Sequence, residues 1–130
     1  MEFGMFHQFP SLPGRSDAET FAEAFEQIDA AEQLGLDVMW LAELHFDPQR
    51  SVLSAPLSIA SAIAARTRRI KIGIAVQVLP LCHPLRIAEE AATVDQISRG
   101  RRAGSSHLHQ RPPRLVLGIC PGDPRVSRGL

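Results

Sequence analysis

The feature that most constrains the fold of this chain is an alternation of short apolar segments with longer amphipathic ones. Strand-like segments occupy residues 1–6, 36–42 and 70–80, and apolar residues at helical spacing follow each of them. A repeat of strand and helix predicts a parallel sheet whose strands are joined by right-handed helical crossovers. The sequence therefore predicts an α/β protein.

Two architectures share this rhythm, the (β/α)8 barrel and the doubly wound sheet. The strand-like segments begin at residues 1, 36 and 70 of a 130-residue chain, a spacing typical of barrels that use about 250 residues for their eight units. A doubly wound sheet usually carries a glycine fingerprint after its first strand. The turn here reads HQFPSLPGRSD and lacks that fingerprint. We therefore expect a partial (β/α)8 TIM barrel, the first three to four β/α units, with an irregular C-terminal tail.

The helices have recognisable boundaries in the sequence. Ser16 and Glu19 have the spacing of a capping box, in which a hydroxyl and a carboxylate each bind a backbone N–H group at the start of a helix. Pro56 suits the first turn of the second helix, where its missing N–H group costs nothing. Gly35 and Gly100 are expected to end the first and third helices, because glycine readily adopts positive φ.

Composition argues against several classes of protein. The chain has 14 basic and 14 acidic residues, so nothing indicates a nucleic-acid or acidic-membrane partner. No apolar run approaches the roughly 20 residues of a spanning helix, and Glu2 stands where a signal peptide would be positive. Cys82 and Cys120 are too few for a disulfide scaffold and lack metal-ligand spacing. We expect a cytoplasmic protein with no metal site.

Residues 102–130 differ in character from residues 1–101. They are rich in arginine, proline and glycine and show no apolar periodicity, apart from a fourth strand that we place at residues 114–120. Two explanations remain open: a truncated product whose tail arose by frameshift, or a genuine insertion before the fourth strand. The histidines of HLH, His107 and His109, lie in this polar stretch without a carboxylate nearby, so we do not expect them to bind metal.

Two titratable side chains follow the second strand directly. Glu43 and His45 come after the apolar run VMWLA, and ligands bind at the carboxyl ends of parallel strands. One interpretation is a functional site. The other is structural: Glu43 bonds to a neighbouring backbone amide or an arginine, and His45 caps the loop.

Three separated motifs give the chain a family resemblance. EFGMF, WLAELHF and GIAVQVLPLCHPLRIAEEAATVDQISRGR occur in the right order between Met1 and Arg101, and they resemble the luciferase-like flavin-dependent monooxygenases, the relatives of bacterial luciferase. The resemblance implies a (β/α)8 barrel, with reduced FMN or a deazaflavin as cofactor and O2 as co-substrate. It also implies oxidation of a small organic substrate. We further expect a flavin reductase as a possible partner and a homo-oligomer.

The resemblance implies roles for particular residues. Glu43 and His45 match the acidic-histidine motif of the family, so they are the expected catalytic residues, and Leu44 stands where many members have a further histidine. Ala75 and Val76 match a pair that a non-prolyl cis peptide joins beneath the flavin ring. Four residues are the expected cofactor-binding residues: Ala75, Val76, His83 and Cys120. His83 would lie just beyond the third strand, and Cys120 on the fourth. Pro121 stands where an arginine commonly approaches the flavin phosphate.

Two functions from different classes are consistent with these features. The first is a flavin-dependent monooxygenase. The alternative is a non-catalytic flavin-binding protein, or a truncated barrel fragment that associates with itself, because an incomplete barrel exposes strand edges and apolar faces.

Overall fold

A computed structural model of the protein describes residues 1–101, which alternate strands with helices. The elements in chain order are β1 (Gly4–His7), α1 (Asp17–Gln33), β2 (Val38–Leu41), α2 (Pro56–Arg66), β3 (Lys71–Ile74), the short 3-10 helix η1 (Leu79–Leu81) and α3 (Pro84–Ser98). The predicted α/β alternation is confirmed. The expected fourth strand at residues 114–120 lies outside the described residues.

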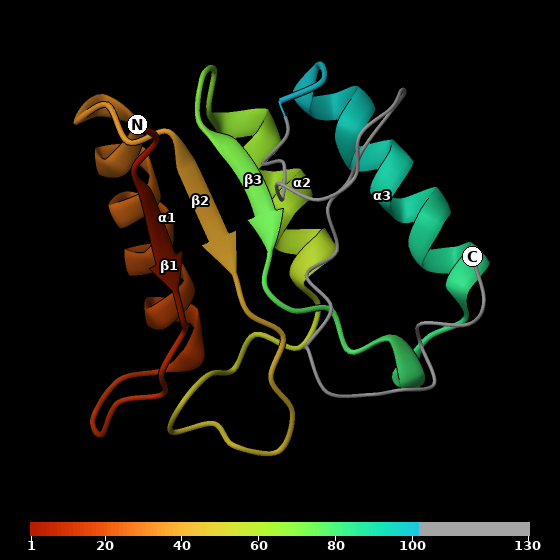
Figure 1. The fold of residues 1–130 in the computed structure, drawn as a ribbon. Coiled ribbons are helices and arrows are strands. Elements are labelled where there is room, and N and C mark those ends of the chain that lie inside the picture. Colours follow the sequence, from red (N-terminus) through yellow and green to blue (C-terminus); the bar gives the residue numbers. More distant parts are fainter. Residues whose placement is uncertain (102–130) are drawn as a thin grey trace.

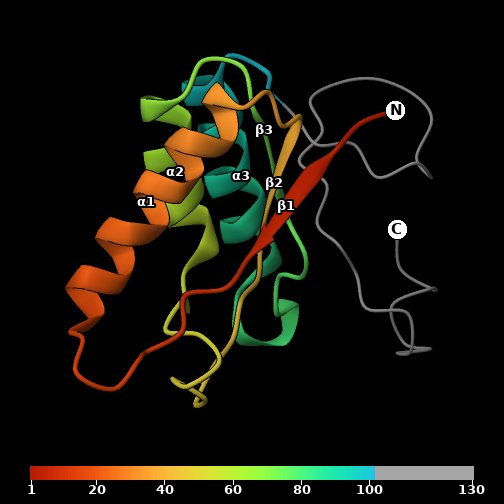
Figure 2. The ribbon, with the colours of Figure 1, turned by 90° about the vertical axis from the view of Figure 1, so that its left-hand side faces the viewer.

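The three strands form one parallel sheet in the order β1-β2-β3. Met5 of β1 is in register with Met39 of β2, which is in register with Ile72 of β3. All three α-helices lie on the same face of this sheet (Figures 1 and 2). Because every strand runs in the same direction, the carboxyl ends of all three meet at one edge of the sheet (Figure 1).

The hydrophobic core lies between the sheet and the helices. Alternate strand residues point to this side, and Met39, Leu41 and Ile74 are fully buried there. Ala60 and Ala64 of α2 are also buried in this core, and their small side chains let the helix approach the sheet closely. Each fully buried large aliphatic side chain stabilises the fold by about 1.5–3 kcal/mol.

The opposite face of the sheet is less covered by the described part of the chain. Phe6 and Trp40 are register partners on this face. The Phe6 side chain is 54% exposed, and Trp40 is half-buried. No helix within residues 1–101 is long and apolar enough to cross a membrane.

The predicted helix boundaries agree with the structure. Ser16 is the N-cap of α1 and forms both hydrogen bonds of the capping box with Glu19. Pro56 is the first residue of α2. Gly35 and Gly100 follow α1 and α3 with φ angles of 89° and 77°, the left-handed conformation that favours glycine.

The prediction for the third strand was wrong in length. A strand was expected over residues 70–80, but β3 ends at Ile74 and Leu79–Leu81 form η1. The backbone N–H of Val78 donates to the carboxylate of Glu43 at 2.6 Å, so a side chain from the neighbouring β/α unit replaces the strand partner that a longer β3 would need. Pro80 has no N–H group for a sheet ladder in any case.

Two charged side chains, those of Arg101 and Glu32, bind backbone groups at the opposite edge of the sheet, near the amino end of β3. Arg101 donates to the carbonyl oxygens of Ala64, Ser98 and Ile70 at 2.5, 2.9 and 3.3 Å, and to the hydroxyl of Thr67 at 2.6 Å. The Glu32 carboxylate accepts the backbone N–H groups of residues 68, 69 and 70. This edge therefore joins α1, α2, α3 and β3.

Candidate active site at the carboxyl ends of the strands

Polar and small residues gather where β2 and β3 end. Glu43 and His45 follow β2, and residues 75–78 follow β3. Figure 1 shows the two segments leaving the same edge of the sheet. Ligands of parallel α/β folds bind at this edge, so we name residues 43–45 and 75–78 the carboxyl rim.

The acid and the imidazole lie together in the rim. The side chain of Glu43 is 2% exposed, and its Oε1 lies 2.7 Å from Nε2 of His45, whose side chain is 25% exposed. Glu43 therefore points into the protein, whereas part of the His45 ring reaches the surface. The structure brings the two expected catalytic residues into one hydrogen-bonded pair.

The other carboxylate oxygen of Glu43 is bound by the segment after β3. Its Oε2 accepts the Val78 backbone N–H at 2.6 Å and a short hydrogen bond from Nε2 of Gln77. The backbone contact agrees with the structural interpretation of Glu43, and the functional interpretation stays a prediction. Sequence reasoning missed Gln77 and Val78. No local signal in the sequence marks either residue as a partner of Glu43.

The charge on Glu43 has an unusual set of partners. Within residues 1–101, no lysine or arginine pairs with this carboxylate, and the imidazole that contacts it is that of His45. A buried carboxylate needs hydrogen-bond donors to replace water. The imidazole, the Gln77 amide and the Val78 N–H supply them, so hydrogen bonds rather than a lysine or arginine hold this carboxylate.

Ala75 and Val76 lie beside this pair. The peptide bond between them is cis, as the resemblance implies. The N–H of Ala75 donates to the carbonyl oxygen of Leu41 at 2.7 Å. The N–H of Glu43 donates to the carbonyl oxygen of Val76 at 3.3 Å. Both side chains are half-buried. The segments that follow β2 and β3 are therefore joined by backbone hydrogen bonds as well as by the Glu43 carboxylate.

The remaining expected cofactor residues have less structural support. His83 is exposed and is the N-cap of α3, where its Nδ1 accepts the N–H of Leu85 at 3.3 Å. This matches the expectation that it begins a helix, and its contact with a cofactor stays a prediction. Cys120, Pro121 and the HLH histidines lie outside the described residues. Within residues 1–101 no group of three His, Cys, Asp or Glu side chains is placed to hold a metal ion.

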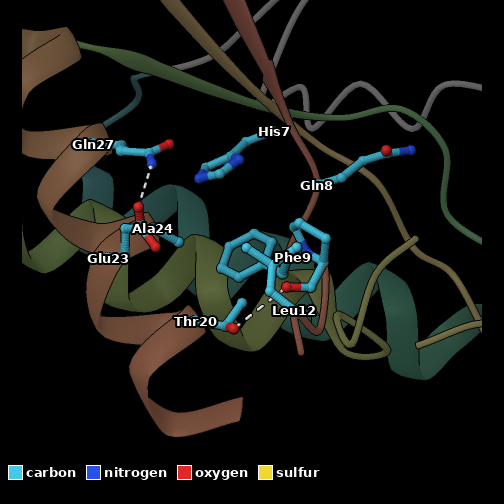
Figure 3. Close-up of a pocket in the computed structure, with 9 residues that line it drawn as sticks. His7, Gln8, Phe9, Leu12, Thr20, Glu23, Ala24 and Gln27 are labelled. Carbon is cyan, nitrogen blue, oxygen red and sulfur yellow. Dashed lines mark hydrogen bonds between the residues drawn. The ribbon is translucent and has the colours of Figure 1, made fainter. Parts of the chain in front are cut away.

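A separate cavity of about 190 Å³ lies on the helix side of β1 (Figure 3). His7 lines it and stacks on Phe9 with ring centroids 4.9 Å apart. Its Nε2 is buried without a hydrogen-bond partner among the described residues. Burial lowers the pKa of His7, against weaker opposing effects of the Gln8 backbone and the Glu23 charge. Because His7 faces α1, this cavity is distinct from the carboxyl rim.

Comparison with known proteins agrees with this arrangement. The family model of the luciferase-like monooxygenases matches residues 1–103. The chain is 33% identical over 103 residues to the alkanal monooxygenase beta chain of Vibrio harveyi, an alignment that covers 79% of this chain and 32% of that protein. It is 33% identical over 129 residues to limonene 1,2-monooxygenase of Rhodococcus erythropolis, covering 96% of this chain and 32% of the relative. The chain belongs to the luciferase-like monooxygenase family.

A solved structure supports the same conclusion. The oxygenating constituent of 3,6-diketocamphane monooxygenase from Pseudomonas putida, determined in complex with FMN, superimposes with a TM-score of 0.72 at 28% sequence identity. The superposition covers 78% of this chain and 28% of that one. The chain thus spans about a third or less of the length of these relatives.

Proposed function

We propose that these β/α units form part of a (β/α)8 barrel that acts as a flavin-dependent monooxygenase, with reduced flavin and O2 oxidising a small organic substrate. The observation that carries the proposal is the buried Glu43–His45 pair at the carboxyl rim, in a chain of the luciferase-like monooxygenase family. A flavin complex is known for a structural neighbour. Reduced flavin, when bound, reacts with O2 and supplies the oxygen atom that enters the substrate.

The residues of the rim fit the ring of a flavin. An isoalloxazine presents a planar apolar surface together with N–H donors and carbonyl acceptors. Ala75 and Val76 offer small, half-buried apolar side chains next to the acid–imidazole pair. Oε1 of Gln77 is a buried acceptor without a partner among the described residues. We therefore assign the ring contact to Ala75 and Val76, and we propose His83 and Cys120 as further cofactor-binding residues.

Each side chain of the pair has its own role in this proposal. His45 holds or moves a proton at its exposed ring edge, because imidazole is the side chain best suited to proton transfer near neutral pH. Glu43 orients the imidazole ring of His45 through the hydrogen bond to Nε2. Leu44, where a further histidine is common in the family, supplies no proton and helps to exclude water. The proton-transfer role therefore belongs to His45.

The cofactor and the partners follow from the same proposal. FMN is the proposed flavin, with a deazaflavin as the second choice, and a separate flavin reductase supplies it in reduced form. We also propose that the working protein is a cytoplasmic homo-oligomer. Its substrate is a small organic molecule.

An FMN titration tests the ring contact. We expect the chain to shift the visible absorption of FMN, and Ala75→Phe to weaken this binding at least roughly tenfold, because a bulky side chain would occupy the space of the ring. Ala22→Phe, on the exposed side of α1, is the matched control and should bind like the parent. Equal binding by both variants would show that the ring does not lie on Ala75.

Turnover separates the enzyme from a flavin binder. With NADH and a flavin reductase, the proposal predicts oxygen consumption coupled to substrate oxidation above the reductase-only background. His45→Asn should abolish this excess while FMN still binds. Binding without any excess would support the non-catalytic reading.

One observation favours a self-associating fragment as the second candidate. Phe6 is 54% exposed, on the face of the sheet that the helices of residues 1–101 leave uncovered (Figure 2). Large exposed apolar side chains favour association. Size-exclusion chromatography of Phe6→Ser tests this candidate, because a fragment that associates through this face would become monomeric in the variant.

A further inference from the structure

The carboxylate of Glu43 is held at both of its oxygens, and the two sets of partners come from different β/α units. Oε1 contacts His45, which follows β2, whereas Oε2 takes its hydrogen bonds from Gln77 and Val78 after β3. A carboxylate fixed at Oε2 cannot rotate about its last bond without losing those donors. Its direction toward the imidazole is therefore set from the neighbouring unit.

The Gln77 amide has one orientation that suits this arrangement. Its NH2 group donates to Glu43, and its Oε1 is buried without a partner among the described residues. Turning the amide over would place two oxygens against each other. A buried acceptor without a partner costs stability, so an apolar residue of similar size would serve packing better. The donor to Glu43 is what the glutamine provides.

The contact with Glu43 also decides which ring nitrogen of His45 is free. Oε2 accepts two N–H donors, and the carboxylate offers the imidazole only an acceptor at Oε1. The proton between Oε1 and Nε2 then belongs to the imidazole, and the lone pair of the neutral ring is on Nδ1. Among the described residues, no hydrogen bond is formed at Nδ1.

We infer that Gln77 is a positioning residue, which orients Glu43 so that His45 keeps its proton on Nε2 and presents Nδ1 as the proton acceptor of the rim. The catalytic value of this arrangement rests on the proposed function, but the arrangement itself exists in the free protein. It can therefore be measured without flavin, substrate or turnover.

The test is NMR of the His45 ring and of the Val78 amide in the free 130-residue chain. In the parent, we expect a ring proton on Nε2 that exchanges slowly enough to be observed, and a protected Val78 N–H. Gln77→Met keeps the length of the side chain and removes the donor. It should abolish the Nε2 proton signal and speed Val78 exchange at least roughly tenfold, the change expected for a lost charge-assisted hydrogen bond. The Met39 amide, in the core, should keep its protection.

Gln27→Met is the matched control, because Gln27 is exposed on α1 and, within residues 1–101, makes only a long hydrogen bond, 3.4 Å, to Glu23. It should leave both signals unchanged. If Gln77→Met does not fold, Gln77→Asn decides, since its shorter side chain withdraws the donor with less change in packing. A parent-like His45 ring proton in a folded Gln77 variant would overturn the inference. FMN titration of the same samples tests the proposed function separately.

Discussion

Replacing Arg101 with alanine should destabilise the protein by about 2–4 kcal/mol and leave the FMN affinity of the folded chain unchanged. The guanidinium donates four hydrogen bonds, to three carbonyl oxygens and to the Thr67 hydroxyl. These contacts join the end of α2, the residue before β3 and the end of α3. They lie at the edge of the sheet opposite the carboxyl rim, where side chains serve stability rather than ligand binding.

The expected loss of unfolding free energy follows from the hydrogen bonds that the four acceptors of Arg101 lose. A hydrogen bond to a charged group contributes about 1.5–3 kcal/mol, but four such values do not add. Water can reach part of this site, because Arg101 is only half-buried. The Thr67 hydroxyl also keeps its bond to the Ile63 carbonyl oxygen at 2.7 Å. The net loss should therefore equal one to two bonds rather than four.

Urea unfolding followed by circular dichroism and by Trp40 fluorescence measures this loss. Arg86→Ala is the control, because Arg86 is 73% exposed and, among the described residues, pairs only with Glu90 one helical turn away; it should cost less than about 0.5 kcal/mol. Arg101→Lys should recover only part of the loss, since an ammonium group cannot reach several acceptors in one plane. A loss below about 1 kcal/mol in Arg101→Ala, or a similar loss in the control, would refute this reasoning.

Three further predictions concern the helix cap and two titratable groups. Ser16→Ala should cost about 1 kcal/mol of unfolding free energy by removing the capping box of α1, and an equal loss in the exposed Ser58→Ala would contradict this assignment. Burial acts to raise the pKa of Glu32, but the backbone N–H groups of residues 69, 70 and 68 outweigh it and the pKa lies below 4.5. The stabilisation by Glu32 should therefore be complete above about pH 4.5 and disappear as the pH falls through the folded-state pKa. Urea titrations at several pH values should show this dependence in the parent and not in Glu32→Ala. His7 has a folded-state pKa below 6.5 because of burial, so its protonation favours the unfolded chain: stability should decrease as the pH drops below about 6.5, and His7→Gln should remove this slope.

The parts of the fold that local sequence determines were predictable. Ser16 and Glu19 lie three residues apart, so their capping box could be recognised without any tertiary information, and the same holds for Gly35 at the end of α1. The parallel sheet followed from the alternation of elements, because consecutive strands joined by helices must run in the same direction. Local sequence signals were therefore sufficient to predict the helices, their boundaries and the parallel direction of the strands.

The rim was predictable only in part. Glu43 and His45 are two residues apart, so their pairing could be expected from the sequence, whereas Gln77 lies 34 residues from Glu43. No local pattern distinguishes a glutamine that binds a carboxylate from one that continues a strand. For the same reason β3 was predicted too long: the apolar residues after Ile74 resemble strand, but a carboxylate from the preceding unit binds the N–H of Val78.

The hydrogen bonds of Glu43 join two successive β/α units, and this has a consequence for recombination between family members. A chimera with its junction between residues 46 and 70 would combine the acid and imidazole of one parent with the amide of the other. A junction after residue 101 would transfer all of them as one block. Exchange among relatives should therefore tolerate the later boundary far better than the earlier one.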